Sequence, residues 1–142
     1  MEKKSAEAER ILRERFGRDS VVALATTEGG LPDVRCVNAY YENDAFYVVT
    51  YARSNKMRQI AAEPQVALAG DWFTAHGEAE DIGFFGSAEN RELADGLRSA
   101  FEAWIDNGDN DLADPNTRIL RIRLTDGLLF SHGVRYDIDF RA

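Results

Sequence analysis

Short segments with β-strand character, separated by brief polar turns, make up most of this chain. Helices do not alternate with these segments in the way that a parallel sheet requires, and the first three segments follow one another closely. The pattern therefore predicts an α+β fold, a Greek-key barrel of six or seven antiparallel strands with flanking helices. β-Branched and aromatic residues are frequent in the expected strands. These strands are residues 20–27, 33–41, 45–51, 65–70, 73–82, 118–124 and 127–131.

Three helices are expected beside the barrel: residues 6–16, residues 56–62, and the longest one between Ser87 and Asn107. The first two follow Ser5 and Ser54, because serine is favoured at helix N-caps. Apolar residues at helical spacing mark one face of the third helix, and this face needs a partner surface. The stripe consists of Leu93, Leu97, Ala100, Phe101, Trp104 and Ile105.

The length of 142 residues is that of one domain, so we expect a single domain over residues 1–142. A net charge of −8 disfavours binding to nucleic acid. No apolar stretch approaches the roughly 18 residues of a membrane span, and the N-terminus is charged, which favours a cytoplasmic protein with no membrane contact. The one cysteine excludes an intramolecular disulfide, and two isolated histidines make a metal site improbable.

The segment from Thr50 to Arg58 concentrates cations and hydroxyl groups where a helix is expected to begin. Free amide groups and the helix dipole favour an anion there, so a phosphate group is a candidate ligand. The alternative is an ordinary capped helix on the surface. The chain has neither the GxGxxG nor the GxxxxGK[ST] pattern, which argues against Rossmann or P-loop binding of a nucleotide.

The order of three segments is more specific. The chain contains RCVN at residues 35–38, VVTY at residues 48–51 and SNKMRQI at residues 54–60, followed by Pro64. This order resembles the pyridoxamine 5'-phosphate oxidase-like superfamily, and in particular its short, general-stress-protein-like branch. The resemblance covers nearly the whole chain. It implies a split β-barrel, a bound flavin mononucleotide (FMN), and a homodimer with the flavin at the interface.

The resemblance also implies which residues contact the flavin ring. Backbone groups of Cys36, Val37 and Asn38 would face the isoalloxazine edge, while Thr50 and Tyr51 would line its other side. The same resemblance assigns the FMN phosphate or ribityl chain to Arg35. The remaining phosphate contacts are carried over to Ser54, Asn55 and Lys56.

One position departs from the family pattern. The family commonly has arginine where this chain has Asn55, which weakens that contact, and two nearby arginines are candidates to compensate, Arg53 and Arg58.

Cys36 is expected to be a small buried hydrophobic residue, since it lies in an apolar strand. The stripe of the third helix and the pair Trp72 and Phe73 are candidates for the dimer interface.

Two functions from different classes follow. The first is an FMN-dependent oxidoreductase acting on an unidentified small molecule, with no catalytic side chain assigned, because the cofactor carries the chemistry. The second is a non-catalytic flavin-binding protein for storage or stress response. Haem or a deazaflavin remains a third possibility within the superfamily. The arginine- and histidine-containing substrate motif of true pyridoxamine phosphate oxidases is not recognisable, so that reaction is not expected.

Overall fold

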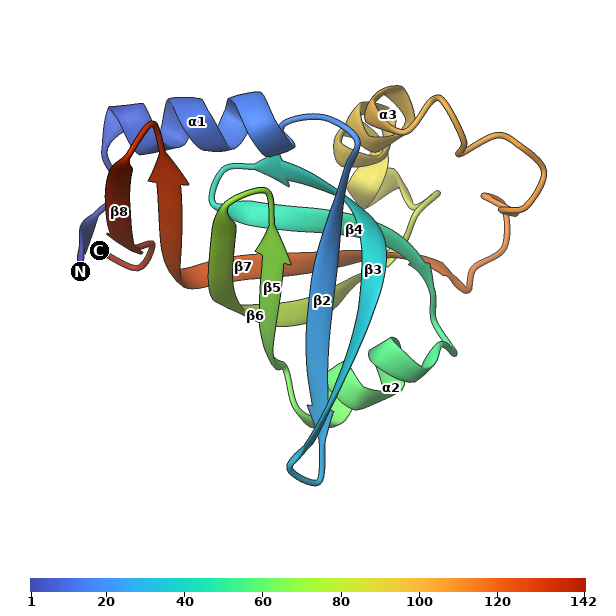
Figure 1. The fold of residues 1–142 in the computed structure, drawn as a ribbon. Helices are drawn as coiled ribbons and strands as arrows, with labels where there is room; N and C mark the ends of the chain where they lie inside the picture. Colours follow the sequence, from blue (N-terminus) through green and yellow to red (C-terminus); the bar gives the residue numbers. More distant parts are fainter.

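Six antiparallel strands close into a barrel in the computed structural model, which describes residues 1–142 (Figure 1). Neighbouring strands follow the order β7-β4-β3-β2-β5-β6, and β6 pairs back with β7. This architecture confirms the expected α+β split barrel. The strands are β2 (Ser20–Glu28), β3 (Leu31–Glu42), β4 (Ala45–Tyr51), β5 (Gln65–Gly70), β6 (Phe73–Phe84) and β7 (Thr117–Ser131).

The barrel wall is split between β3 and β4. These strands pair only next to their turn, from Tyr40 to Glu42 on β3, whereas β3 pairs with β2 from Leu31 to Ala39. β4 in turn pairs with β7 along its whole length. The first nine residues of β3, from Leu31 to Ala39, therefore have one edge without a strand partner.

Two tight hairpins fix the direction of the β3 backbone. Asn43 and Asp44 both have positive φ between β3 and β4, as do Gly29 and Gly30 between β2 and β3. Two-residue turns of this kind match the twist of the flanking strands and set the register. Backbone groups on one edge of a strand come from every second residue. Both hairpins therefore direct the even-numbered residues of β3 toward the side of β4.

Two further strands and a helix extend one end of the barrel. β8 (Val134–Asp139) pairs with β7, and β1 (Glu2–Lys3) pairs in parallel with β8. α1 (Ala6–Phe16) lies across this end, near both chain termini (Figure 1). The expected helix at residues 6–16 is confirmed, but the two strands expected at 118–124 and 127–131 form one continuous strand, β7. A register shift at Thr125 lets β7 continue through the predicted break.

The third helix is shorter than expected. A 3-10 turn at Ala88–Asn90 precedes α3 (Arg91–Ala100), so the helix begins behind Asn90 rather than Ser87 and is not the longest. The side chain of Asn90 donates to the carbonyl oxygens of Ile82 and Phe84, both at 3.1 Å, which anchors this start to β6. After Ala100 the chain continues as turns.

Apolar residues form two clusters on opposite sides of the barrel wall. Inside the barrel, Phe16 of α1 meets Phe46 and Phe73 at ring-centroid distances of 5.4 and 5.7 Å. Outside, the stripe of α3 and its following turns packs on β4 and β7, where Leu97, Phe101 and Ile105 are buried, so most of the stripe is covered within its own chain. Phe73 is buried in the barrel core, whereas Trp72 beside it is 70% exposed. No helix has the length and apolar character needed to cross a membrane.

Candidate functional site

α2 (Asn55–Ala62) follows β4 and packs against β2 and β6 at the end of the barrel opposite α1 (Figure 1). Its N-cap is Ser54, yet the Ser54 side chain caps no backbone amide. Its Oγ atom is buried and has no hydrogen-bond partner. Ser5, at the start of α1, accepts a bond from Ala8 N at 3.1 Å. Because a buried hydroxyl without a partner is costly, the Ser54 side chain is suited to bind a ligand.

The first amide groups of α2 are free as well. The N–H groups of Asn55, Lys56 and Met57 donate to no backbone or side-chain acceptor, and the first intrahelical bond runs from Arg58 N to Ser54 O at 3.1 Å. Such amides, together with the helix dipole, attract negative charge. The start of α2 is therefore equipped for an anion by its backbone as well as by Ser54.

Arg35 of β3 lies near the start of α2, and its guanidinium group donates hydrogen bonds only to neutral acceptors. Its Nη1 atom donates to Leu24 O at 3.3 Å and to Thr26 Oγ1 at 2.7 Å, and its Nη2 atom donates to Gln59 Oε1 at 3.2 Å. No carboxylate forms a salt bridge with Arg35 within 4.0 Å, unlike Arg58, which pairs with Glu28. The guanidinium charge is therefore fixed in position but not neutralised.

Lys56 adds a second positive charge without a counter-ion. Burial, and repulsion from the guanidinium of Arg35, lower the pKa of the Lys56 ammonium group. These two causes mean that the charged form is partly desolvated and that no carboxylate offsets the loss of water. Arg35, Ser54 and Lys56 thus form a cationic site with unused donors, which we call the α2 anion site.

The other residues predicted to contact the phosphate are more exposed. Asn55 and Arg53 are exposed, and neither side chain forms a hydrogen bond within the chain. Arg58 is exposed and engaged by Glu28 of the β2–β3 hairpin. Arg58 is thus paired within the chain, whereas Arg53 is not.

The open edge of β3 separates the predicted ring contacts into two kinds. The backbone groups of Cys36 and Asn38 face the split, whereas those of Val37 face β2, as the hairpin register requires. The side chain of Cys36 is exposed on the outer face. The expectation that Cys36 is a buried hydrophobic residue was wrong, because alternation along β3 directs Val37 and Ala39 inward and Cys36 outward.

The side chain of Asn38 is already engaged. Asn38 Nδ2 donates to Asp19 Oδ1 at 3.0 Å, and Trp104 Nε1 donates to Asp19 Oδ2 at 3.1 Å. Asp19 therefore ties the turns after α3 to the upper part of β3. On the other side of the split, Thr50 of β4 is buried and Tyr51 is exposed.

Three residues of this region were not identified from the sequence: Thr26, Asp33 and Gln59. Thr26 and Gln59 are buried, and both contact Arg35. Asp33 accepts a hydrogen bond from Gln59 Nε2 at 2.7 Å. A polar residue on the inward face of an otherwise apolar strand or helix is the only local signal for such contacts.

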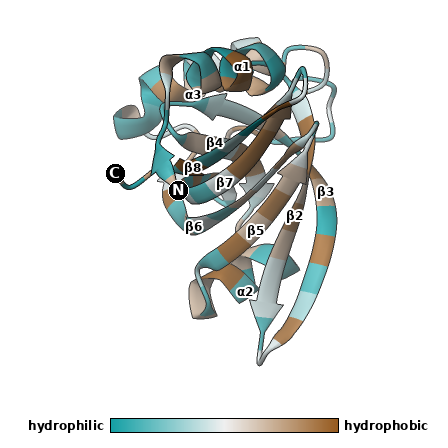
Figure 2. Ribbon diagram, turned by 60° about the vertical axis from the view of Figure 1, so that its left-hand side comes forward, coloured by the Kyte–Doolittle hydropathy of each residue, from teal (hydrophilic) through white to brown (hydrophobic).

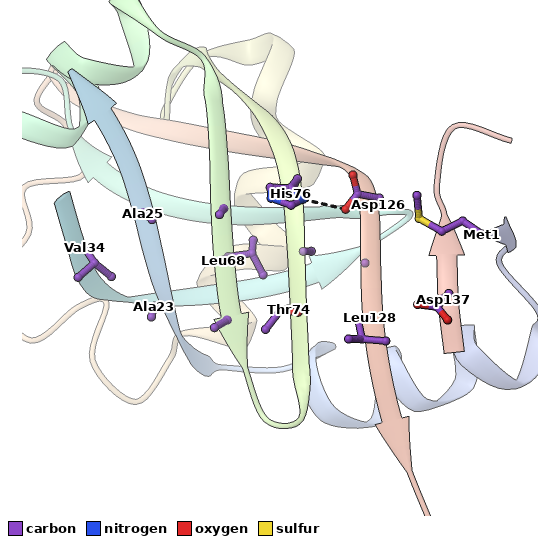
Figure 3. Close-up of a pocket in the computed structure, with 14 residues that line it drawn as sticks. Met1, Ala23, Ala25, Val34, Leu68, Thr74, His76, Asp126, Leu128 and Asp137 are labelled. Atoms are coloured by element: carbon purple, nitrogen blue, oxygen red, sulfur yellow. Dashed lines mark hydrogen bonds and ion pairs between the residues drawn. The ribbon is translucent and has the colours of Figure 1, made fainter. Parts of the chain in front are cut away.

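A separate groove of about 490 Å³ lies on the outer face of β2, β5, β6 and β7 (Figure 3). Alanine side chains form much of its floor, and Arg35, Ser54 and Lys56 do not line it. At one side His76 Nδ1 lies 2.8 Å from Asp126 Oδ1, as the dashed line in Figure 3 shows. Figure 2 shows that β2, β3 and β5, which carry residues of this groove, are rich in hydrophobic residues.

Comparisons with known proteins agree with this fold. No curated protein matches the sequence. A solved FAD-binding protein from Mesorhizobium loti is 18% identical, with a TM-score of 0.66 and coverage of 87% of this chain and 92% of that one. General Stress Protein 26 from Bacillus anthracis is 20% identical, with a TM-score of 0.58 and coverage of 78% and 83%.

An F420 reductase is also 20% identical, with a TM-score of 0.57 and coverage of 81% of this chain and 94% of that one. At these identities the three structures support the fold. The family model described as pyridoxamine 5'-phosphate oxidase matches residues 8–130 of this chain. With a split barrel and a match over most of its length, the chain belongs to the pyridoxamine 5'-phosphate oxidase family, a flavin-binding family that includes oxidoreductases.

Proposed function

We propose that this protein binds FMN with the phosphate group in the α2 anion site, and that it is an FMN-dependent oxidoreductase acting on a small molecule. One observation carries the proposal. The buried Ser54 Oγ atom has no partner, and it lies at a helix start with free amides, Lys56 and the nearby Arg35. A phosphate dianion offers several acceptor oxygens and two negative charges, which match these donors.

Each part of the split has a role in this proposal. Ser54, Lys56 and the first amides of α2 would hold the phosphate, and Arg35 would add a charge-assisted bond. The backbone donors of Cys36 and Asn38 would face the polar edge of the ring and stabilise negative charge there. When bound, FMN supplies hydride transfer to or from the substrate. No side chain of the site is then required as a base.

A second copy of the chain is the partner that we propose for the outer face. Cross-strand register places two rows of side chains on this face: Val34, Ala25, Ala67 and His76 in one row, and Cys36, Ala23, Ala69 and Thr74 in the other. Val21 and Val34 are 60% and 69% exposed at its margin. The rows reach the open edge of β3, so a chain covering them would also help to enclose the cofactor. Exposed apolar surfaces of this kind are typical of homodimer interfaces.

The alternative is a flavin-binding protein without turnover. One structural neighbour is described as a general stress protein, which favours a role in stress response. Tight flavin binding with no reduction by any donor would support this alternative.

The test begins with the cofactor that copurifies. Heat-released cofactor is identified by mass, which separates FMN from FAD and from the deazaflavin F420. The apoprotein is then titrated with FMN, riboflavin and FAD by quenching of flavin fluorescence, and the holoprotein is mixed with NADH or NADPH under anaerobic conditions. We expect FMN to bind most tightly and its absorbance at the flavin band to bleach with one donor. A colourless protein that binds none of these flavins would contradict the proposal.

A further inference from the structure

A buried polar network lies behind the α2 anion site, and Gln59 is its centre. Gln59 Oε1 accepts hydrogen bonds from Thr26 Oγ1 and from Arg35 Nη2, and Gln59 Nε2 donates to Asp33 Oδ2. Thr26 is fully buried, and Gln59 is 3% exposed. Buried polar groups in such a network are stabilising only when every partner is in place.

The partners fix the orientation of the Gln59 amide. The carboxylate of Asp33 only accepts hydrogen bonds, so it must face the NH₂ group of Gln59. The carbonyl oxygen of Gln59 then faces Arg35, which only donates. Thr26 completes the arrangement, because its hydroxyl donates to Gln59 and accepts from Arg35 Nη1 at 2.7 Å.

This network holds a guanidinium group without neutralising it. The three acceptors of Arg35 are neutral: two side-chain oxygens, from Thr26 and Gln59, and one backbone carbonyl oxygen. The carboxylate of Asp33 is separated from Arg35 by the amide of Gln59. The Nε atom of Arg35 has no partner within the chain. A carboxylate in the place of Gln59 would instead form an ion pair and compete with any bound anion.

We propose that Thr26 and Gln59 are positioning residues that hold Arg35 through neutral acceptors, and that they thereby make the site select phosphorylated flavin over riboflavin. This inference rests on the proposed function, because it concerns the same phosphate site. It adds a specific requirement: the residue beside Arg35 must accept hydrogen bonds without carrying charge.

Gln59→Glu tests the requirement with an almost unchanged shape. Its carboxylate would lose the hydrogen bond to Asp33, be repelled by that residue and pair with Arg35. We therefore expect the dissociation constant of FMN to rise at least ~10-fold, the scale of one charge-assisted hydrogen bond. Riboflavin has no phosphate, so its dissociation constant should change less than about threefold. Thr26→Val should act in the same direction, and Thr26→Ser, which keeps the hydroxyl, should restore the wild-type ratio of the two constants.

Gln65→Glu is the matched control. Gln65 is exposed at the start of β5, and this substitution makes the same change of charge as Gln59→Glu. It should leave the ratio of FMN to riboflavin affinity unchanged. Thermal unfolding of each apoprotein shows whether the variant folds, and the ratio cancels differences in the folded fraction. If the wild type binds FMN but Gln59→Glu keeps the wild-type ratio, the positioning role is wrong while the proposed function stands. If the wild type binds no FMN, both fail.

Discussion

Arg35 and Lys56 bring two positive charges together at the split of the barrel, and neither forms a salt bridge within the chain. Burial, together with repulsion from Arg35, lowers the pKa of Lys56. The two side chains come from β3 and α2, which are separated in sequence by the whole of β4. This arrangement is unfavourable in the free protein and would become favourable if an anion bound between the two cations, as we propose for the FMN phosphate.

The first prediction concerns this pair. Arg35→Ala and Lys56→Ala should each weaken FMN binding by about 1.5–3 kcal/mol, because each removes one charge-assisted contact. The double variant should lose several kcal/mol, without strict additivity, because the two residues are coupled. Fluorescence titration with FMN measures the effect. Arg91→Ala, an exposed arginine on α3, is the control, and an unchanged affinity in the double variant would refute the assignment.

The second prediction concerns pH and the stability of the apoprotein. The folded pKa of Lys56 lies below its ordinary value of 10.5. Between these two values the unfolded chain binds more protons, so the contribution of Lys56 to the free energy of unfolding rises with pH and becomes level above 10.5. Below the lowered pKa, the charged side chain destabilises the folded state by a constant amount.

Lys56→Met isolates this contribution, because all other groups titrate alike in both proteins. We expect the variant apoprotein to be more stable than the wild type at neutral pH, with a difference that shrinks as the pH approaches 10.5. Urea unfolding at several pH values measures it. A difference that does not change with pH would show that Lys56 is not strained in the apoprotein.

The third prediction uses two glycines with opposite surroundings. A Cβ atom on Gly77 of β6 would lie 2.7 Å from Ile122 Cγ2 and 2.9 Å from the backbone oxygen of Arg123. Gly77→Ala should therefore cost about 1–3 kcal/mol of stability through overpacking. Gly96 of α3 has no heavy atom within 4 Å of the same position, so Gly96→Ala should stabilise by about 0.5–1 kcal/mol. Urea unfolding of both variants checks the sign, and equal effects would argue against the close approach of β6 and β7.

The fourth prediction tests the proposed dimer. Val34→Asp places a charge on the outer face, at a position that is exposed in the single chain, so the fold itself should tolerate it. We expect the wild type to be a dimer and the variant to be a monomer with weaker flavin binding, as measured by light scattering after size-exclusion chromatography. Ser99→Asp on the exposed side of α3 is the control. A variant that remains dimeric would place the interface elsewhere.

Local sequence pattern was sufficient for most of the secondary structure. The helix at residues 6–16 and the strands at 45–51 and 65–70 have the expected bounds, because capping residues, turns and apolar periodicity all act over a few residues. The end of α3 was not predictable in this way. Its apolar stripe continues to Ile105, but the contacts of Phe101 and Ile105 with β4 and β7, and of Trp104 with Asp19, are made by turns rather than by a continuous helix.

The α2 anion site also has features that the local sequence determines and features that only the tertiary structure decides. The sequence by itself determined that hydroxyls and cations lie at the start of α2, and its order of motifs pointed to Arg35 as their partner. Only the tertiary structure decided that Ser54 is left without a partner, that Cys36 faces outward, and that Thr26 and Gln59 hold Arg35. The physical reason is that capping and strand alternation act between neighbouring residues, whereas an uncompensated charge depends on what strands and helices far apart in the sequence place around it.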